Sequence, residues 1–328
     1  MKKSIIKKLF IKLSKIMGYE IIDQNSFTSP TLDKELNKDL SKLNDKSIVL
    51  PLGEVKISRK VKSILILFRT NSNVEIWDQN KKRLFELPKI EYTLRSLNSL
   101  LKSINFSKEK YPYSKIKLII IDDNTNEINL SKIKKLINNN TDISITKVNH
   151  DKYKELIKKQ KNDETFSNLA SLLCSYEIAK KNADDLVFFV EDDYLHFEAM
   201  MEEMIASYER ISSQLNKDIF MCPADYPYLY MNNHKTNILI GNKRHWRTVN
   251  ETLCTFLTSK ELLEKYWDNF YKTCLDRHDP FEKYINEIYN SEICISPLKS
   301  LSVHFTNINS SYGLSPFIDY KKLWDESD

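Results

Sequence analysis

The feature that most restricts the fold of this chain is a series of strand-like and helix-like segments that alternate between residues 62 and 190. Strands buried on both faces are nearly continuous apolar runs, whereas helices repeat apolar residues every three or four positions. Such alternation builds a parallel sheet covered by helices on both faces, so we predict an α/β fold with a mostly parallel sheet. The predicted strands are 63–68, 116–121, 143–148 and 186–190, and the predicted helices are 87–101, 128–137 and 166–179.

Beyond residue 196 the pattern is looser and predicts shorter elements. Gly241-Asn242 is a turn pair between two apolar segments, which predicts a β-hairpin over 238–249. Ser259 precedes an amphipathic run as a helix cap, and Asp279-Pro280 precedes another with proline at the first helical position. The other predicted elements are helices over 197–215, 259–273 and 279–289, and strands over 218–222, 253–257, 293–295 and 301–305.

Glycine is scarce, with only four residues in the chain, and no two of them lie closer than 35 positions. Dinucleotide-binding and P-loop motifs need clustered glycines, because backbone must approach the phosphates closely. The sequence therefore argues against classical NAD-dependent dehydrogenases and P-loop NTPases. Any nucleotide bound here has to be held by side chains and a metal ion.

The first 17 residues carry six lysines and no acid, which accounts for more than the net charge of +5. The other 311 residues sum to −1, and this balance argues against a nucleic-acid-binding domain. Apolar residues recur at helical spacing over 4–17, opposite most of the lysines. This segment either lies on an anionic membrane surface or packs against the domain or a partner.

Residues 24–60 form a connecting arm in which Ser29-Pro30 predicts a helix start. A thin leucine stripe from Leu32 to Leu43 suits a helix that lies on a surface or pairs with another copy of the chain. No segment has the apolar length of a membrane span, and lysines interrupt every apolar run of the N-terminus. We therefore expect a cytoplasmic protein.

The five cysteines lie 20 to 48 residues apart, without a C-x-x-C pair. An odd count and this spacing fit neither a zinc knuckle nor a secreted disulfide framework. We expect reduced thiols in the core.

The strongest chemical motif is Glu191-Asp192-Asp193, directly after an apolar strand. Three adjacent carboxylates repel one another, and burying them is costly unless a cation is present. Mg²⁺ or Mn²⁺ commonly uses one or two carboxylates together with substrate oxygens. The alternative is a solvated strand end.

A second acidic pair, Asp122-Asp123, follows the strand predicted over 116–121. Such carboxylates can accept hydrogen bonds from a nucleotide base or from ribose hydroxyls, or they can cap a turn. Ligands of parallel sheets bind beyond the carboxyl ends of the strands, where both acidic motifs lie.

These motifs, in this order, resemble the GT-A nucleotide-diphosphosugar glycosyltransferases. KLIIIDDNTNE resembles the D-D-G-S-x-D element of family 2 enzymes, with Asn124 in place of glycine, and VEDDY is similar to the metal motif of N-acetylglucosaminyltransferase I. The resemblance covers about residues 62–215. It implies a nucleotide-sugar-binding half at 61–222 and an acceptor-side half at 223–328. The basic helix and arm at 1–60 lie outside it.

The resemblance also implies roles for individual residues. Arg69 and Thr70 would border the base, Asp122 and Asp123 would contact base or ribose, and Asn168 would lie near the nucleotide. Asp193 would bind the metal directly, while Glu191 and Asp192 would contact ribose, the metal or its water. Several enzymes of this fold add a C-terminal histidine ligand, for which His304 is the candidate; a core histidine is the alternative.

An inverting transfer needs a base for the acceptor hydroxyl. The candidates are Asp225, Glu251 and Asp279; we prefer Asp279, with Glu251 second, and a plain helix cap is the alternative for Asp279. The cluster Arg244-His245-Trp246-Arg247 would hold diphosphate or stack on a sugar, or would form the outer face of the hairpin. Tyr226, Tyr228 and Tyr230 form either a sugar platform or a half-buried loop.

The leading hypothesis is a Mn²⁺- or Mg²⁺-dependent glycosyltransferase that moves a sugar, with inversion, from a UDP- or GDP-sugar to a glycan or lipid-linked glycan in polysaccharide assembly. A nucleotidyltransferase that makes the sugar nucleotide is one alternative, although those enzymes use a glycine-rich phosphate loop. The other is a non-catalytic glycan-binding or scaffold subunit of an envelope polysaccharide complex.

Overall fold

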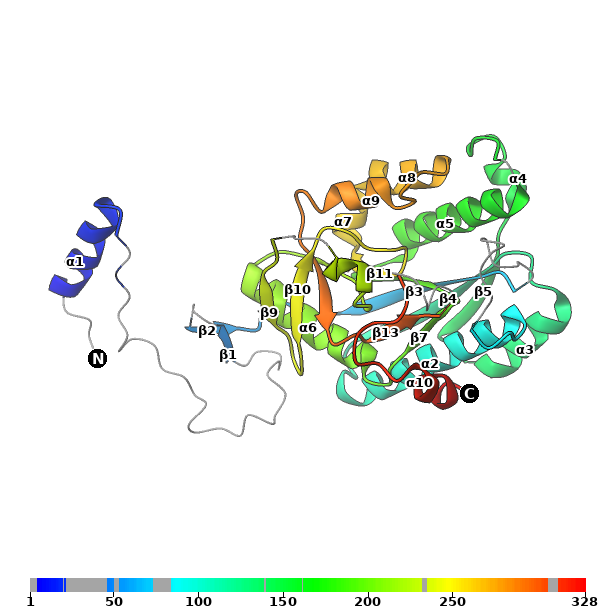
Figure 1. Ribbon diagram of the computed structural model, residues 1–328, viewed down its shortest axis with the longest axis horizontal. Coiled ribbons are helices and arrows are strands. Elements are labelled where there is room, and N and C mark those ends of the chain that lie inside the picture. Colours follow the sequence, from blue (N-terminus) through cyan, green and yellow to red (C-terminus); the bar gives the residue numbers. More distant parts are fainter. Residues whose placement is uncertain are drawn as a thin grey trace.

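The computed structural model describes residues 5–19, 21, 46–49, 53–72, 84–138, 140–160, 162–231, 235–305 and 312–328 (Figure 1). The helix predicted from Ser29 lies outside the described residues. Within the arm, strands β1 (Lys46–Val49) and β2 (Gly53–Lys56) pair antiparallel.

The central sheet has the strand order β5-β4-β3-β6-β11-β8-β12-β10-β9 in the described chain. Its first four strands are parallel to one another, as the alternating pattern predicts. Buried apolar residues fill β3 and β6 almost throughout, since helices cover both faces. These four strands are β3 (Ser63–Thr70), β4 (Lys115–Asp122), β5 (Ile143–Lys147) and β6 (Leu186–Glu191).

The other half of the sheet is mixed. Strand β11 runs antiparallel to β6 and β8, while β12 runs parallel to β8. The predicted hairpin is confirmed, because β10 pairs antiparallel with β9. At its turn, a Cβ on Gly241 would lie 2.4 Å from the buried indole of Trp246, so a close approach requires glycine there. The strands are β8 (Phe220–Met221), β9 (Ile238–Ile240), β10 (His245–Val249), β11 (Phe256–Ser259) and β12 (Cys294–Leu298).

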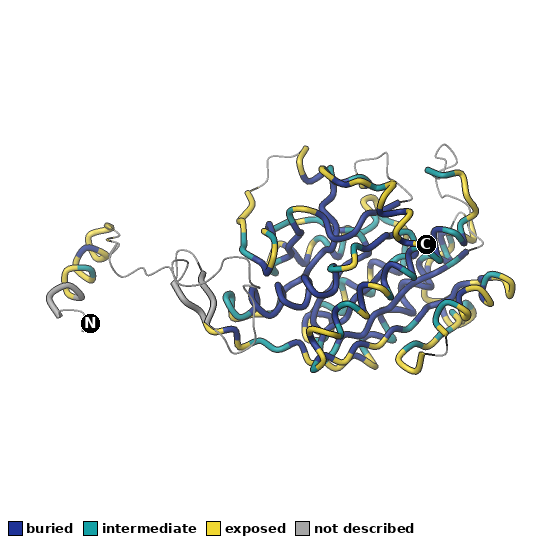
Figure 2. The backbone as a smooth tube through the Cα atoms, turned by 90° about the horizontal axis from the view of Figure 1, so that it is seen from below, coloured by how far each residue is buried: buried dark blue, intermediate teal, exposed yellow. Residues whose placement is uncertain are grey.

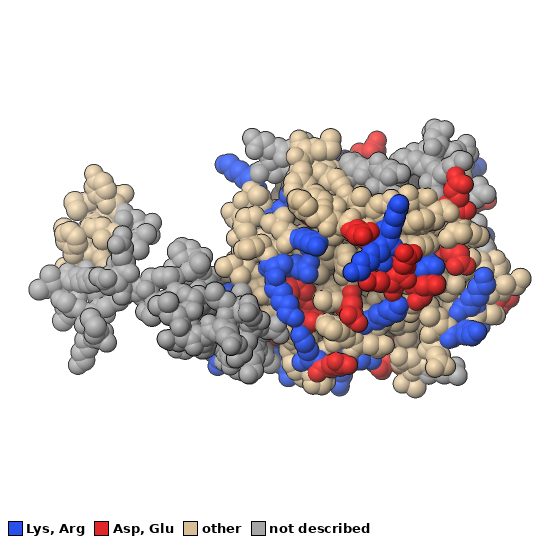
Figure 3. Space-filling view, turned by 60° about the horizontal axis from the view of Figure 1, so that its bottom comes forward, with Lys and Arg blue, Asp and Glu red and all other residues tan. Residues whose placement is uncertain are grey.

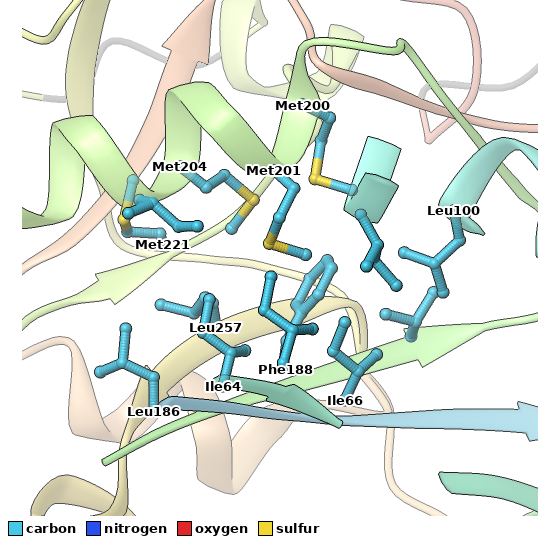
Figure 4. Close-up of a cluster of buried hydrophobic side chains, with 14 of the residues drawn as sticks. Ile64, Ile66, Leu100, Leu186, Phe188, Met200, Met201, Met204, Met221 and Leu257 are labelled. Atoms are coloured by element: carbon cyan, nitrogen blue, oxygen red, sulfur yellow. The ribbon is translucent and has the colours of Figure 1, made fainter. Parts of the chain in front are cut away.

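Helices lie on both faces of the sheet (Figure 1). Ile64, Ile66 and Phe68 of β3 pack with helices α2 and α6, and Figure 4 shows the methionines of α6 above Phe188. The alternate residues Leu65 and Leu67 pack with α5 and α8. The helices are α2 (Lys89–Lys110), α3 (Glu127–Ile137), α4 (His150–Tyr153), α5 (Asp163–Asn182), α6 (Met200–Leu215), α7 (Lys260–Lys265), α8 (Trp267–Leu275), α9 (Lys283–Ile288) and α10 (Tyr320–Glu326).

Three predicted helices differ clearly from the structure, and the first is α2, which continues to Lys110 beyond its predicted end at residue 101. The run after Ser259 forms two helices, α7 and α8, divided at Tyr266, although Ser259 does cap α7 by accepting from the backbone N–H of Leu262. The helix predicted from Asp279 begins only at Lys283. The prediction that Asp279 caps a helix is therefore wrong. All five cysteines are buried and free, as expected.

Helix α1 (Ile5–Ile16) confirms the predicted N-terminal helix, and its apolar face is exposed. Leu9, Phe10, Leu13 and Ile16 are each more than half exposed. Figure 2 shows the described part of helix α1 as mostly exposed, in contrast with the buried central strands. No helix among the described residues has the length and hydropathy needed to cross a membrane.

A separate two-stranded sheet lies next to the end of β6. Strand β13 (Ser302–His304) pairs antiparallel with β7 (Tyr194–His196), so that His304 lies opposite Tyr194. This pairing brings a residue from near the C-terminus to the acidic motif at 191–193.

Candidate functional site

A cavity of about 1090 Å³ lies at the carboxyl ends of the parallel strands. Most of the predicted site residues line it, although they come from distant parts of the chain. On the face shown in Figure 3, acidic and basic side chains are interspersed. The predicted residues that line the cavity are Arg69, Thr70, Asp123, Asn168, Glu191, Asp192, Asp193, Glu251, Asp279 and His304.

Arg69 links three elements on one wall of this cavity. Its guanidinium is buried and donates to the Asn168 side chain at 2.8 Å and to Glu191 at 2.7 Å. Burial raises the pKa of Glu191, although the adjacent Arg69 favours the carboxylate. The end of β3 is thereby fixed to α5 and to the end of β6, with a cation and an anion at the cavity.

Asp192 is bound on all sides by the protein. Its carboxylate accepts from Thr70 Oγ1 at 2.9 Å, Thr93 Oγ1 at 2.8 Å and Lys89 Nζ at 2.6 Å. These donors come from β3 and α2, so Asp192 ties α2 to the sheet. The predicted roles of Asp192 in ribose and metal binding are not supported, because its carboxylate already accepts these three hydrogen bonds. The predicted place of Thr70 at the base is not supported either, because its hydroxyl is bonded to Asp192.

Asp193 and His304 form the second charged pair of the motif. His304 Nε2 lies 3.0 Å from Asp193 Oδ2, and the imidazole stacks on the Tyr194 ring at 4.7 Å. Burial disfavours the imidazolium, but the Asp193 carboxylate, together with Glu191, outweighs this, so that the pKa of His304 is raised. The β7–β13 pairing produces this contact, which no local sequence signal specifies.

Within the described chain, no group of three or more His, Cys, Asp or Glu side chains is arranged to hold a metal ion. The Asp193 carboxylate, together with His304 once its imidazole has lost the proton, nevertheless fits Mn²⁺ or Mg²⁺ whose other ligands are substrate oxygens and water. A site of this kind would be incomplete without the substrate.

Asp123 faces the cavity, whereas Asp122 is buried and does not line it. Asp123 accepts from Ser167 Oγ and lies 2.5 Å from His150 Nε2. Burial raises the pKa of Asp123, while Ser167 and His150 lower it. Sequence reasoning missed His150 and Ser167, because each lies on a helix whose approach to β4 only the fold defines.

Glu251, Asp279 and Glu282, from the chain beyond residue 250, form another wall of the cavity. Asp279 is exposed in the segment before α9. Glu282 precedes the first residue of α9, and its carboxylate accepts from Cys254 Sγ at 3.6 Å. Burial, together with Glu191, raises the pKa of Glu282 to about 7. The sequence did not indicate Glu282, because it lay inside the helix predicted over 279–289.

The predicted diphosphate residues Arg244 and Arg247 are not among the residues that line the cavity. Arg244 donates to the Lys299 carbonyl at 2.6 Å, and Arg247 binds Asp225 at 2.5 Å. Asp225, a candidate base, is therefore engaged in a buried ion pair. Trp246, between the two arginines, is in the core.

No protein-family model and no curated protein matches this chain. Among solved structures it is similar to the galactosyltransferase LgtC in complex with donor and acceptor sugar analogs, at 11% identity and a TM-score of 0.36 over 69% of this chain and 70% of that one. It is also similar to mouse xyloside xylosyltransferase 1, at 10% identity and 0.37 over 70% and 76% of the two chains. A third similar structure is UDP-glucose pyrophosphorylase from Acinetobacter baumannii, at 8% identity and a TM-score of 0.40 over 82% of this chain and 92% of that one. These likenesses are too weak to assign a family.

The raised pKa of Glu282 predicts a pH-dependent stability. Between its ordinary value of 4.5 and about 7, the folded state binds more protons at Glu282 than the unfolded state does. The free energy of unfolding therefore falls as pH rises through this window. Glu282→Gln should remove this dependence, so that its stability relative to wild type is about 3 kcal/mol higher at pH 8 than at pH 4.5.

Urea denaturation of wild type and Glu282→Gln across this pH range measures the effect. Glu287→Gln, on the exposed side of the same helix, is the matched control and should follow wild type. Parallel pH profiles for wild type and Glu282→Gln would contradict the assignment.

Proposed function

We propose that this chain is a metal-dependent glycosyltransferase that uses a nucleoside diphosphate sugar. The observation that carries the proposal is one cavity with two chemically different walls. One wall presents Arg69 with Glu191 and Asp193 with His304, at the carboxyl ends of the sheet. The other presents carboxylates around Glu282. The first suits a nucleoside diphosphate and the second suits a hydroxyl that has to lose its proton.

The nucleotide would be held by side chains. Asp123 and Asn168 can accept hydrogen bonds from the base or ribose, and the Arg69 guanidinium favours anionic groups next to it. Asp193 and His304 would hold Mn²⁺ or Mg²⁺, which supplies charge neutralisation for the leaving diphosphate. This division agrees with a chain that has no glycine-rich phosphate loop.

The acceptor side would complete an inverting transfer. The acceptor oxygen bonds to the anomeric carbon as the bond to the diphosphate breaks, and the hydroxyl proton passes to a carboxylate. Glu282 is the best candidate, because its pKa of about 7 lets it accept a proton near neutral pH. Asp279 and Glu251, the candidates from the sequence, line the same wall and serve as comparisons.

The decisive experiment is a panel of UDP- and GDP-sugars with saccharide acceptors, in which release of nucleoside diphosphate is measured with and without Mn²⁺. We expect metal-dependent release for at least one donor, and its loss in Asp193→Ala and in excess EDTA. Undiminished activity of Asp193→Ala or in EDTA would refute the metal role. Release of pyrophosphate from a nucleoside triphosphate and a sugar 1-phosphate would instead identify a nucleotidyltransferase.

The proton acceptor is tested by isosteric amides. Glu282→Gln should lower kcat by ~10²-fold or more, because the substituted side chain cannot take the proton. The wild-type rate should rise with pH up to about 7, as Glu282 ionises. Asp279→Asn and Glu251→Gln are matched comparisons at the same wall. An inactive Asp279→Asn beside a fully active Glu282→Gln would return the role to Asp279.

The N-terminal helix fits an acceptor carried on a lipid. Its exposed apolar residues Leu9, Phe10 and Leu13 accompany exposed Lys12 and Lys15, so that both apolar burial and charge favour an anionic membrane surface. We expect the full chain to co-sediment with vesicles containing phosphatidylglycerol, and binding to weaken with salt. Deletion of residues 1–17 should abolish this binding. Binding that survives the deletion, or is absent at low salt, would exclude the anchor.

A further inference from the structure

A second hollow, of about 630 Å³, borders the candidate site on the acceptor side. It is formed by the 3-10 helix η3 (Pro227–Tyr230) and the segment 314–319. The same helix also borders the large cavity, which Tyr228 and Tyr312 line with their rings 5.2 Å apart. The two hollows are therefore on either side of one shared wall.

Tyr230 in this hollow is fixed by a buried ion pair. Its hydroxyl donates to Asp225, and the Arg247 guanidinium lies 4.2 Å from the centre of its ring. Asp225 and Arg247 are bound to each other at 2.5 Å and are both buried, while Tyr230 itself is 52% exposed. The chain thus uses a costly buried charge pair to hold an exposed aromatic ring in one orientation.

Phe317 on the other side of the hollow has no structural reason to be aromatic. Its side chain is 91% exposed, and its backbone has a φ of 62°, a left-handed conformation that is unfavourable for a bulky residue. An exposed aromatic ring held in strained backbone lowers stability, which is typical of a residue retained for binding.

Ser315 adds a polar group to the same hollow. The residue is 2% exposed and lines the hollow, and its Oγ has no hydrogen-bond partner within the described chain. A buried hydroxyl of this kind can be satisfied by a ligand hydroxyl. Exposed Asp319, which also lines the hollow, provides a carboxylate at its edge.

We propose that this hollow binds a pyranose ring of the acceptor glycan, with Tyr230 and Phe317 as apolar walls and Ser315 as a hydroxyl partner. A pyranose has one face of C–H groups, which packs on an aromatic ring, and a rim of hydroxyls that needs polar partners. Asp225 and Arg247 are positioning residues for Tyr230. The proposal rests on the proposed glycosyltransferase function. It says that the acceptor glycan reaches the cavity across this hollow.

The test is saturation-transfer NMR of the full chain with lactose, maltose, cellobiose and N,N′-diacetylchitobiose, in the absence of nucleotide. At least one disaccharide should bind wild type. Phe317→Gly and Tyr230→Ala should each weaken that binding ~10-fold, as expected for loss of one aromatic contact. Tyr230→Phe, which keeps the ring and loses the bond to Asp225, should weaken it less than Tyr230→Ala does.

Ile128→Ala on α3 is the control, since Ile128 is another exposed apolar residue that lines neither hollow, and it should bind as wild type. Thermal melting shows which variants fold; Phe317→Gly should melt above wild type, because glycine relieves the left-handed backbone. Absence of binding to wild type, or binding unaffected by the Phe317 and Tyr230 substitutions, overturns the proposal. Dimerisation that Phe317→Gly abolishes, without saccharide binding, would assign the hollow to a second copy.

Because no nucleotide is present, this test is separate from the test of the proposed function. If saccharides bind at the hollow but no donor releases nucleoside diphosphate, the protein binds glycans and the proposed enzyme function is refuted. If a donor releases nucleoside diphosphate but no saccharide binds at the hollow, the enzyme function stands and the acceptor subsite is refuted.

Discussion

The structure depends on how three adjacent carboxylates are neutralised at the end of one buried strand. Glu191 is paired with Arg69, Asp192 with Lys89 and Asp193 with His304. Each partner comes from a different element, namely β3, α2 and β13. Because uncompensated charge is costly at a partly buried position, the three pairs fix these elements around the end of β6.

This distribution of partners also divides the motif by role. Asp192 is surrounded by donors of the fold and stabilises the start of α2. Glu191 and Asp193 remain at the cavity and act on the groups around them. Glu191 adds to the effect of burial in raising the pKa of Glu282, and Asp193 favours the charged form of His304. The clustered acids thus share one cavity with a carboxyl group whose pKa is raised.

The sequence predicted the parallel strands and the hairpin correctly, because their signals are local: apolar runs, helical periodicity and a Gly-Asn turn. It could not show which partners a residue finds far along the chain. Asp192 was given the same ligand-binding roles as its neighbours, although donors of the fold surround it. Glu282 lay inside a predicted helix that in fact begins one residue after it. Arg247 was assigned to diphosphate, but it binds Asp225. The predicted division at residues 60 and 222 stays a prediction.

By itself, the sequence determined the alternation of strands and helices, the two acidic motifs at strand ends, and the absence of a glycine-rich phosphate loop. These features can be identified from the sequence alone, because they depend on residue types and their spacing along short stretches of the chain. Only the tertiary structure decided which carboxylates face the cavity and which partners they have. His304, for example, lies more than a hundred residues after Asp193 in the chain, and the β7–β13 pairing brings the two together. Side-chain direction at a strand end and burial of an acid are properties of packing, and no local pattern encodes them.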